Sequence, residues 1–461
     1  MSAGLTAPRT VRTIGDLTGP RGLPLVGHLA ELRFGRDGHR AFERWGERYG
    51  PTYLIRYGRH PLVVSGDGPL VNAALRDRPD GFRRTGVNRV FRDLGIDGVF
   101  NAEGERWRRL RKMAAQSLNA AYLREYFTSI TRSAERLRTR WSSVAATGRP
   151  VDVLDDLMRF TLDVTTALAV GHDLNALEAT GDGLHTRLAE LFPEIGRRIQ
   201  GPIPYHGIVR LPRDRRRESA VREVDALVRE KYAEAQARIA TGAPPRTFLE
   251  ALAGQGEFSH DELVGNVLTM LLAGEDTTSS AAAWTLHYLA THPEAQLRVR
   301  GEAVEAFGAG GMPGDPSAFR NLRFTEACVN EAMRLRPIAP TAGLRALRDT
   351  VLPGTDHDLS LPRGSSLLVL LSYGARAVPD PGEFRPSRWL DGDPPPASAP
   401  LLPFGVGPRF CPGRNLALLE ATLVAALACR DFTLTPGPGR VREKLAFAAF
   451  PTGLRLNFTP N

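Results

Sequence analysis

Cysteine is scarce in this 461-residue sequence, which contains only Cys328, Cys411 and Cys429. Three widely separated cysteines cannot form the disulfide framework of a small secreted protein. No group of cysteines and histidines has the spacing of a zinc site either. The sequence therefore indicates a reducing compartment, and we expect a cytoplasmic protein.

Long uncharged hydrophobic runs are also missing. No stretch is apolar enough to cross a bilayer, and the first twenty residues contain no run typical of a signal peptide. We expect a soluble protein with no membrane anchor. The net charge of +9 would suit an acidic partner, but no nucleic-acid motif accompanies it. No nucleic-acid partner is therefore expected.

Helical periodicity is abundant between residues 101 and 336. Strand-like patterns lie nearer the ends of the chain, as an expected hairpin over 52–66 and a cluster over 343–371. Composition alone allows one large core or two to three domains. Because we find no internal repeat and no clear linker, we expect one mainly α domain over 1–461, with an irregular lead-in over about 1–20.

One long helix is predicted from Ser259 to about residue 292. Ser259 and Glu262 form a capping box at its start, and Pro293 marks its end. Its middle, "AGEDTT", interrupts an apolar pattern. Gly274 costs about 1 kcal/mol relative to alanine in a helix interior. The hexapeptide therefore indicates either a kink with a small polar patch or a functional site.

Cys411 lies in the loop "PFGVGPRFCPGR", where glycine and proline force an irregular backbone. A thiolate is a soft metal ligand, and such a loop can leave its sulfur open to a flat cofactor. Arg409 supplies a cation for an anionic cofactor. The alternative role of a small buried hydrophobic residue is favoured for Cys328 and Cys429, which lie in helical patterns.

The loop resembles the haem-binding signature of the cytochrome P450 family, F-x-x-G-x-R-x-C-x-G. All fixed positions match, at Phe404, Gly407, Arg409, Cys411 and Gly413. The resemblance implies a mainly helical fold with small β-sheets in a single triangular-prism domain. It also implies haem b (iron protoporphyrin IX) with iron ligated by the Cys411 thiolate, and Phe404 packed near the sulfur.

Further family motifs follow one another in the right order. "EAMR" resembles the E-x-x-R pair, with Glu331 and Arg334 one turn apart on one helix face. Arg388 is similar to the third member of that structural network, although Ser387 replaces the more usual acidic residue before it. The family pattern assigns the haem propionates to the indole and guanidinium groups of Trp107, Arg111, Arg345 and Arg409.

"AGEDTT" resembles the oxygen-activation motif of the family. Met270, Ala273 and Thr277 are spaced i, i+3, i+7, so one side of the long helix is expected to face the iron. Thr277 is expected to interact with the carbonyl of Ala273, and Gly274 to leave room for dioxygen. Asp276 is expected to link to a proton chain.

The resemblance implies a monooxygenase that inserts one atom of dioxygen into a lipophilic molecule by hydroxylation or epoxidation, as in secondary metabolism. No G-x-G-x-x-G follows a strand, so we expect no fused reductase. A ferredoxin or flavodoxin with its NAD(P)H reductase would then supply electrons to a monomeric enzyme. The alternatives are a peroxide-driven or non-oxidative haem-thiolate enzyme, and a haem-based sensor or binding protein.

By resemblance, mostly apolar segments line the substrate pocket: 84–99, 191–205, 264–273, 338–344 and 447–452. Candidate pocket residues are Met270, Leu344, Phe447 and Phe450. A fatty acid, terpene, steroid or polyketide fits such a lining. A separate basic surface is expected to face either an acidic electron donor or solvent, and it comprises Arg106, Arg108, Arg109 and Lys112.

Overall fold

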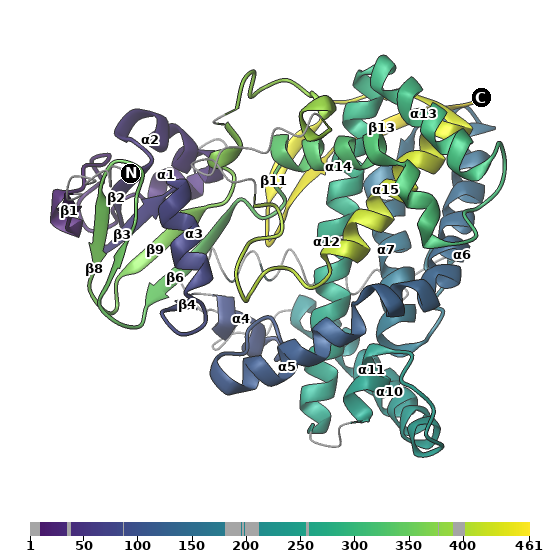
Figure 1. Cartoon of the computed structure of the whole chain (residues 1–461), viewed down its shortest axis with the longest axis horizontal. Helices are drawn as coiled ribbons and strands as arrows, with labels where there is room; N and C mark the ends of the chain where they lie inside the picture. Colours follow the sequence, from purple (N-terminus) through teal and green to yellow (C-terminus); the bar gives the residue numbers. More distant parts are fainter. Residues whose placement is uncertain are drawn as a thin grey trace, which may run out of the picture. The chain divides into compact units, whose positions relative to one another are not determined.

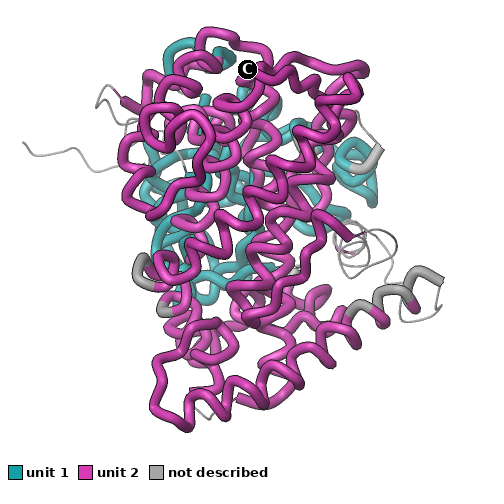
Figure 2. The backbone as a smooth tube through the Cα atoms, turned by 90° about the vertical axis from the view of Figure 1, so that its right-hand side faces the viewer, with its two compact units in different colours: residues 1–86, 339–383, 394–411 teal, residues 87–338, 384–393, 412–461 magenta. Residues whose placement is uncertain are grey.

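A computed structural model describes most of the chain, which forms two compact units (Figure 2). Each unit is assembled from segments that are distant in the sequence. Unit 1 comprises residues 1–86, 339–383 and 394–411, and unit 2 comprises the rest. The described residues are 10–34, 38–85, 87–179, 195, 198, 212–254, 258–376, 378–390 and 402–461.

Unit 1 is built on a five-stranded sheet of order β2-β3-β9-β6-β4, in which β3 and β9 are parallel (Figure 1). A second sheet has the order β1-β8-β7. The strands are β1 Val11–Arg12, β2 Thr52–Tyr57, β3 His60–Ser65, β4 Phe82–Arg84, β6 Thr341–Ala346, β7 Thr350–Leu352, β8 Asp358–Leu361 and β9 Ser366–Leu370. The helices are η1 Ile14–Asp16, α1 Leu29–Phe34, η2 Gly38–Arg40, α2 Ala41–Tyr49, α3 Gly68–Arg76 and η5 Gly374–Arg376.

The predicted hairpin over 52–66 is confirmed. Tyr57 pairs with His60, which leaves Gly58 and Arg59 as a two-residue turn. Gly58 has φ +63°, the left-handed backbone that such turns require of a glycine. The predicted strand cluster over 343–371 is also confirmed, as β6 to β9.

Unit 2 is mainly helical, with the long α12 (His260–Thr291) among α7, α14 and α15 (Figure 1). Its other helices are α4 Val87–Asp93, α5 Gly104–Ser117, α6 Ala120–Ala145, α7 Val153–Val170, α10 Pro212–Ala240, α11 Phe248–Ala253, α13 Pro293–Phe307, η4 Pro316–Asn321, α14 Arg323–Leu335, η6 Pro386–Trp389 and α15 Arg414–Asp431. Its strands are β5 Val151–Asp152, β10 Phe432–Pro436, β11 Arg442–Leu445, β12 Ala449–Thr452 and β13 Arg455–Pro460, paired as β10-β13-β5 and β11-β12.

The predicted limits of the long helix are confirmed. Ser259 is the N-cap of α12, and the capping box with Glu262 is complete. The helix is unbroken through "AGEDTT", and Gly274 lets it pack closely on α7. A Cβ atom at Gly274 would lie 2.7 Å from Thr165 Oγ1, so a larger residue fits only if the Thr165 side chain shifts.

The mainly helical fold with small sheets is confirmed. In the part of the chain that the structure describes, no helix has both the length and the apolar character needed to span a bilayer.

Candidate functional site

The cysteine loop ends unit 1 as a chain of tight turns. The Cys411 N–H donates to the Phe404 carbonyl at 2.8 Å, and the Phe410 N–H donates to the Gly407 carbonyl at 3.1 Å. Gly407 has φ +77°, and a Cβ atom there would lie 2.7 Å from the Arg76 Cα of α3. Only glycine satisfies both the backbone conformation and this close approach. The backbone of the loop therefore holds residue 411 next to residue 404, and packing of the Phe404 ring near the sulfur stays a prediction.

Cys411 differs from the other two cysteines in accessibility. Its side chain is half-buried, whereas Cys328 on α14 and Cys429 on α15 are buried. Burial strongly raises the pKa of both of those thiols, which keeps them protonated and inert. The prediction that Cys328 and Cys429 are core residues is confirmed.

The other predicted haem contacts of unit 1 lie on this loop and on β6. Arg345 is exposed, and its Nε donates to the Gly364 carbonyl at 3.2 Å. Its neighbour Leu344 is fully buried in the hydrophobic core of unit 1. Arg409 lies on the cysteine loop, half-buried. Contact of these residues with haem or substrate stays a prediction.

In unit 2, Trp107 and Arg111 lie one turn apart on α5, so both side chains are on the same helix face. Trp107 is buried with Ala102 and Leu110, and Arg111 is half-buried. Gly413 is the N-cap of α15, so this helix begins directly after the cysteine loop. Their roles as haem contacts also stay predictions.

An accessible stripe runs along the middle of α12. Met270, Ala273, Gly274 and Thr277 are exposed or half-buried, while the residues around them on this helix are buried. The spacing i, i+3, i+4, i+7 places them on one face. Thr277 Oγ1 donates to the Ala273 carbonyl at 2.6 Å, which confirms the predicted bond. A helix buried elsewhere thus opens one face where the motif predicts a reaction centre.

Two neighbouring carboxyl groups next to this stripe are buried. Asp276 is 5% exposed, and burial raises its pKa to about 7. Glu275 is 1% exposed, and burial, followed by the charge of Asp276, raises its pKa well above the ordinary value. Asp276 Oδ2 and Glu275 Oε2 have no hydrogen-bond partner among the described residues. Asp276 can therefore gain or lose a proton near neutral pH.

Two buried acids were not identified from the sequence. Glu275 precedes Asp276 directly, and its backbone carbonyl accepts a hydrogen bond from Thr161 Oγ1 of α7 at 3.1 Å. Glu420 is 2% exposed on α15, and burial raises its pKa well above the ordinary value. The signal for Glu420 was a single charge within the apolar run "LALLEATLV".

The predicted Glu331, Arg334 and Arg388 network is present in unit 2. Arg334 Nε and Nη2 each lie 2.8 Å from a carboxylate oxygen of Glu331, and Arg388 Nε lies 2.9 Å away. The Trp389 indole and the Arg385 N–H also donate to this carboxylate, each at 2.9 Å. Burial alone would raise the pKa of Glu331, but the hydrogen bonds led by Arg334 lower it below its ordinary value. The network ties α14 to η6.

We expect Glu331→Gln to destabilise the protein by about 3–5 kcal/mol, because it leaves buried cations without their counter-charge. The pKa of Glu331 is lower in the folded protein than in the unfolded chain. The Glu331 carboxylate therefore stabilises the fold above about pH 4. This contribution is lost as the pH falls through the folded pKa. Urea unfolding of both proteins measures the difference. Glu326→Gln, on the exposed face of α14, is the matched control, and an equal loss in both would contradict the role of the network.

The predicted basic surface on α5 is largely neutralised by acids of unit 2. Arg106 lies 2.8 Å from Asp97 and 3.1 Å from Glu262, and Arg109 lies 2.9 Å from Glu262. Arg108 is paired with Glu105. Three of the four expected cations are therefore already engaged in ion pairs, which reduces the charge available to a partner.

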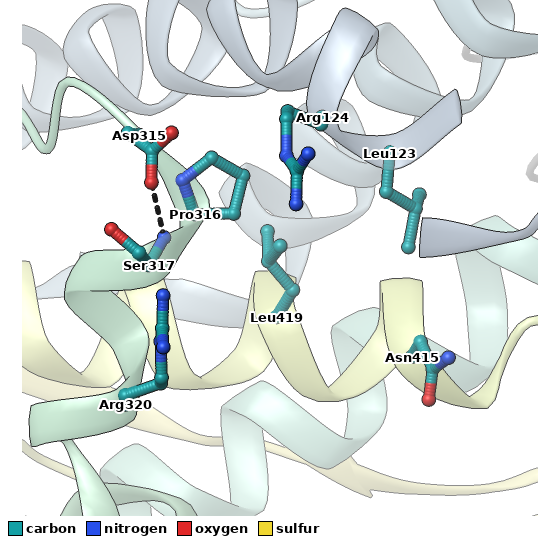
Figure 3. A pocket seen from close by; sticks show the side chains of 8 residues that line it. All are labelled: Leu123, Arg124, Asp315, Pro316, Ser317, Arg320, Asn415 and Leu419. Carbon is teal, nitrogen blue, oxygen red and sulfur yellow. Dashed lines mark hydrogen bonds between the residues drawn. The ribbon is translucent and has the colours of Figure 1, made fainter. Parts of the chain in front are cut away.

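Another part of unit 2 does present unpaired cations. An open pocket of about 740 Å³ lies between the start of α6, η4 and the start of α15 (Figure 3). Within the described residues, Arg124 and Arg320 have no ion pair or side-chain hydrogen bond. Hydrogen bonds from Ser317, followed by the charges of these two arginines, lower the pKa of Asp315. The lining residues are Leu123, Arg124, Asp315, Pro316, Ser317, Arg320, Asn415 and Leu419.

Aromatic rings gather around one predicted pocket residue. Phe447 lies 5.4 Å from Phe91 and 5.5 Å from Phe100 between ring centroids. All three rings and Met270 belong to one hydrophobic cluster. Phe450 is on β12, half-buried. The predicted pocket segment 191–205 lies outside the described residues except for 195 and 198.

These residues fit a haem. The half-buried thiol on a glycine-constrained loop is the donor that haem-thiolate proteins use, and α12 offers an accessible face. The sequence profile of the Cytochrome P450 family matches residues 17–452. The chain therefore belongs to the cytochrome P450 family.

The similar proteins carry cytochrome P450 or hydroxylase names. The chain is 30% identical to 25-hydroxyvitamin D-1 alpha hydroxylase, mitochondrial, of Homo sapiens, across 95% of this chain and 91% of that protein. The Mus musculus protein of the same name is 29% identical, across 94% and 90%. The self-sufficient cytochrome P450 monooxygenase CYP505E4 of Penicillium expansum is 27% identical, across 97% of this chain but only 43% of that protein.

Family membership establishes the class of chemistry. The chain is an oxidoreductase of the haem-thiolate monooxygenase class. It binds haem with a cysteine thiolate as the iron ligand, and the assignment of that role to Cys411 stays a prediction.

Proposed function

We propose that this enzyme inserts one atom of dioxygen into a lipophilic small molecule, by hydroxylation or epoxidation, with electrons from a separate donor. The observation that carries this proposal is the accessible stripe of α12, which ends at Thr277, with the buried Asp276 as its neighbour in the chain. A hydroxyl at an open helix face, next to a buried acid with pKa about 7, is suited to controlled proton delivery.

When bound, the haem supplies the redox chemistry that splits dioxygen. The chain supplies the protons and the positioning. The Thr277 hydroxyl is held toward the Ala273 carbonyl, so its oxygen is free to accept a hydrogen bond from water on the accessible side. Asp276 stores or releases a proton near neutral pH and lies next to Thr277 in the chain. Trp107, Arg111, Arg345 and Arg409 would satisfy the propionates.

Substrate-dependent use of NADPH with surrogate redox partners tests this proposal. A monooxygenase consumes NADPH and forms an oxygenated product when a substrate is present. A peroxide-driven or non-oxidative enzyme forms product without NADPH, and a sensor forms none. Either of the last two results would overturn the proposal.

We propose that the substrate is lipophilic because the cluster around Met270, Phe91, Phe100 and Phe447 is apolar and aromatic. Fatty acids, terpenes, steroids and polyketides are therefore the classes to screen. Displacement of water from the haem by a substrate changes the haem absorption band, which provides the readout. The three free cysteines fit a reducing compartment, and we propose the cytoplasm.

We propose that the electron donor is a ferredoxin or flavodoxin with its NAD(P)H reductase, and that it docks at the pocket of Figure 3. The pocket combines an apolar lining from Leu123 and Leu419 with the two unpaired arginines. Asn415, which also lines it, follows the predicted haem ligand Cys411 by four residues. A hydrophobic contact with cationic flanks suits an acidic donor.

We expect Arg124→Glu combined with Arg320→Glu to slow electron transfer from an acidic donor by roughly ten-fold at low salt. The difference should shrink in high salt, since the Debye length falls from about 10 Å at 0.1 M to about 3 Å at 1 M. Stopped-flow reduction at several donor concentrations measures this. Arg222→Glu, an exposed position on α10, is the control. An equal effect in the control, or no dependence on salt, would contradict docking at this pocket.

A further inference from the structure

A short turn of unit 2, residues 97–101, is fastened to the first half of α12 by a buried asparagine. The Val99 N–H donates to Asn266 Oδ1 of α12 at 2.9 Å. Asn266 is fully buried, and its Nδ2 donates to the Glu262 carbonyl at 2.7 Å. The amide group of Asn266 thus uses its acceptor on the turn and its donor on its own helix, which fixes its orientation.

Two glycines bring the backbones of the turn and the helix into direct contact. A Cβ atom at Gly98 would lie 2.7 Å from the Gly265 carbonyl oxygen. A Cβ atom at Gly265 would lie 2.5 Å from the Asp97 carbonyl oxygen. Neither glycine has a positive φ, so the close approach accounts for both of them. A larger residue at either position would push the turn away from α12.

The turn is also held in shape by its own side chains. Asn101 Oδ1 accepts from the Gly98 N–H at 3.0 Å, and Asn101 Nδ2 donates to Asp97 Oδ1 at 2.9 Å. Asp97 Oδ2 lies 2.8 Å from Arg106 of α5, which also contacts Glu262 of α12. Because these bonds connect the members of the turn, a displacement from α12 would move the whole segment.

Asn266 lies on the same face of α12 as the accessible stripe. Met270, Ala273 and Thr277 follow it at i+4, i+7 and i+11, which are positions on one side of a helix. At about 1.5 Å per residue, Asn266 is about 6 Å along the helix from Met270. The turn therefore lies at the N-terminal end of the stripe.

The turn carries a phenylalanine into the aromatic cluster next to the stripe. Phe100 directly follows Val99, and its ring lies 4.9 Å from Phe91 and 5.5 Å from Phe447 between centroids. Phe100 and Phe447 are half-buried and pack, like Met270, against one hydrophobic cluster. The position of the Phe100 ring thus depends on where the turn is fastened to α12.

We propose that Asn266 is a positioning residue for substrate specificity, which holds Phe100 in the aromatic cluster and so limits the bulk of the substrate along the stripe. Asn266 acts through the Val99 N–H and takes no part in the oxygen chemistry. Without its acceptor a buried N–H has no partner, and the turn gains by moving out to water. Bulky substrates then gain space beside Met270, while compact substrates are little affected. This proposal rests on the proposed function, because it assumes that the substrate lies along the stripe.

Hydrogen exchange of the Val99 amide tests the bond without a substrate or an electron donor. Asn266→Leu keeps the size of the side chain but removes its acceptor, and it should speed this exchange about ten-fold or more in the haem-loaded protein. Asn266→Asp keeps an acceptor oxygen and should exchange like the unchanged protein. Thr285→Val is the matched control, because Thr285 is equally buried on α12 but donates to the Ala281 carbonyl of its own helix.

Binding of two imidazoles of different bulk tests the effect on specificity. Imidazole is compact and clotrimazole carries three aromatic rings, and both change the haem absorption band when they bind. We expect Asn266→Leu to keep the Kd of imidazole and to raise the preference for clotrimazole about ten-fold. Gly98→Ala should act in the same direction, because its Cβ atom pushes the turn off α12. Asn266→Asp and Thr285→Val should keep the original preference.

The proposal is overturned if Asn266→Leu leaves the Val99 exchange unchanged, or if exchange rises while the preference for clotrimazole stays the same. It is also overturned if Asn266→Asp behaves like the leucine variant, since the acceptor would then have no role. Should Asn266→Leu lose the haem band, the same two measurements on Gly98→Ala decide the outcome. Failure of the proposed function is detected separately, by the absence of substrate-dependent NADPH use in the unchanged protein.

Discussion

Cys411→Ala should abolish the red-shifted Soret band of the reduced protein with carbon monoxide, because that band requires a thiolate ligand to the haem iron. The expected effect is complete loss, since among the three cysteines only Cys411 is accessible. The loop should persist, because its hydrogen bond to Phe404 comes from the backbone N–H of residue 411 and alanine keeps that group.

Cys328→Ala and Cys429→Ala are the controls for this result. Both side chains are buried in helices, and their raised pKa values keep them as thiols. We expect some loss of stability in each variant from the smaller side chain, but an unchanged band position. The ligand assignment fails if Cys411→Ala keeps the band, or if either control loses it while remaining folded.

Local sequence signals predicted several elements correctly. The capping box of Ser259 and Glu262 placed the start of α12, since both partners lie within one turn. The pairing of Glu331 with Arg334 likewise depends on an i, i+3 spacing within one helix. Such interactions join residues that are neighbours in the chain, so their spacing in the sequence is enough to predict them.

Long-range pairings could not be predicted in the same way. Arg106 and Arg109 were expected to form a free basic surface, but their partner Glu262 is about 150 residues away in the chain. The Trp389 indole donates a hydrogen bond to the carboxylate of Glu331, which is also distant in the sequence. No periodicity in the sequence encodes which distant acid a given arginine meets. Only the three-dimensional structure therefore distinguishes the unpaired Arg124 and Arg320 from arginines that form ion pairs with distant acids.

The acid at "AGEDTT" shows a third situation, in which the motif was correct but incomplete. The sequence pointed to Asp276, and the structure adds a second buried acid at Glu275. Two adjacent buried carboxyl groups raise each other's proton affinity when one is charged. The charge state of the pair is thus set by burial of both carboxyl groups and, for Glu275, also by the charge of Asp276. The periodicity of the sequence does not report either effect.

Thr277→Ala and Asp276→Asn should have different effects on the reaction at this face of α12. Thr277→Ala should lower the yield of product, and Asp276→Asn should lower the rate of the whole cycle. Alanine cannot hold a water molecule by both donating and accepting a hydrogen bond, as the Thr277 hydroxyl can. Thr277→Ala is therefore expected to bind haem and substrate and to consume NADPH, but to release more hydrogen peroxide and less oxygenated product. Measuring product and free hydrogen peroxide per NADPH consumed shows how the electrons divide between the two.

Asp276→Asn is expected to slow the whole cycle, because the amide cannot store the proton that the carboxyl carries near pH 7. General acid-base assistance contributes about 10²- to 10⁴-fold, so the loss of turnover should be large. The same variant should gain stability over the unchanged protein as the pH rises from about 4 to 7. Across that range Asp276 of the unchanged protein binds more protons in the folded state than in the unfolded state. Its ionisation therefore reduces the free energy of unfolding, by about 1.4 kcal/mol for each unit by which folding raises its pKa.

This opposite change in activity and stability distinguishes proton delivery from structural damage, which would lower both. Ser280→Ala, also buried on α12, is the matched control and should keep the wild-type ratio of product to NADPH. If Thr277→Ala and Asp276→Asn both form product at the wild-type rate and yield, the accessible stripe of α12 does not deliver protons. The Thr277 bond to Ala273 would then only satisfy a hydroxyl within a helix, and the proposed role of this motif would fail.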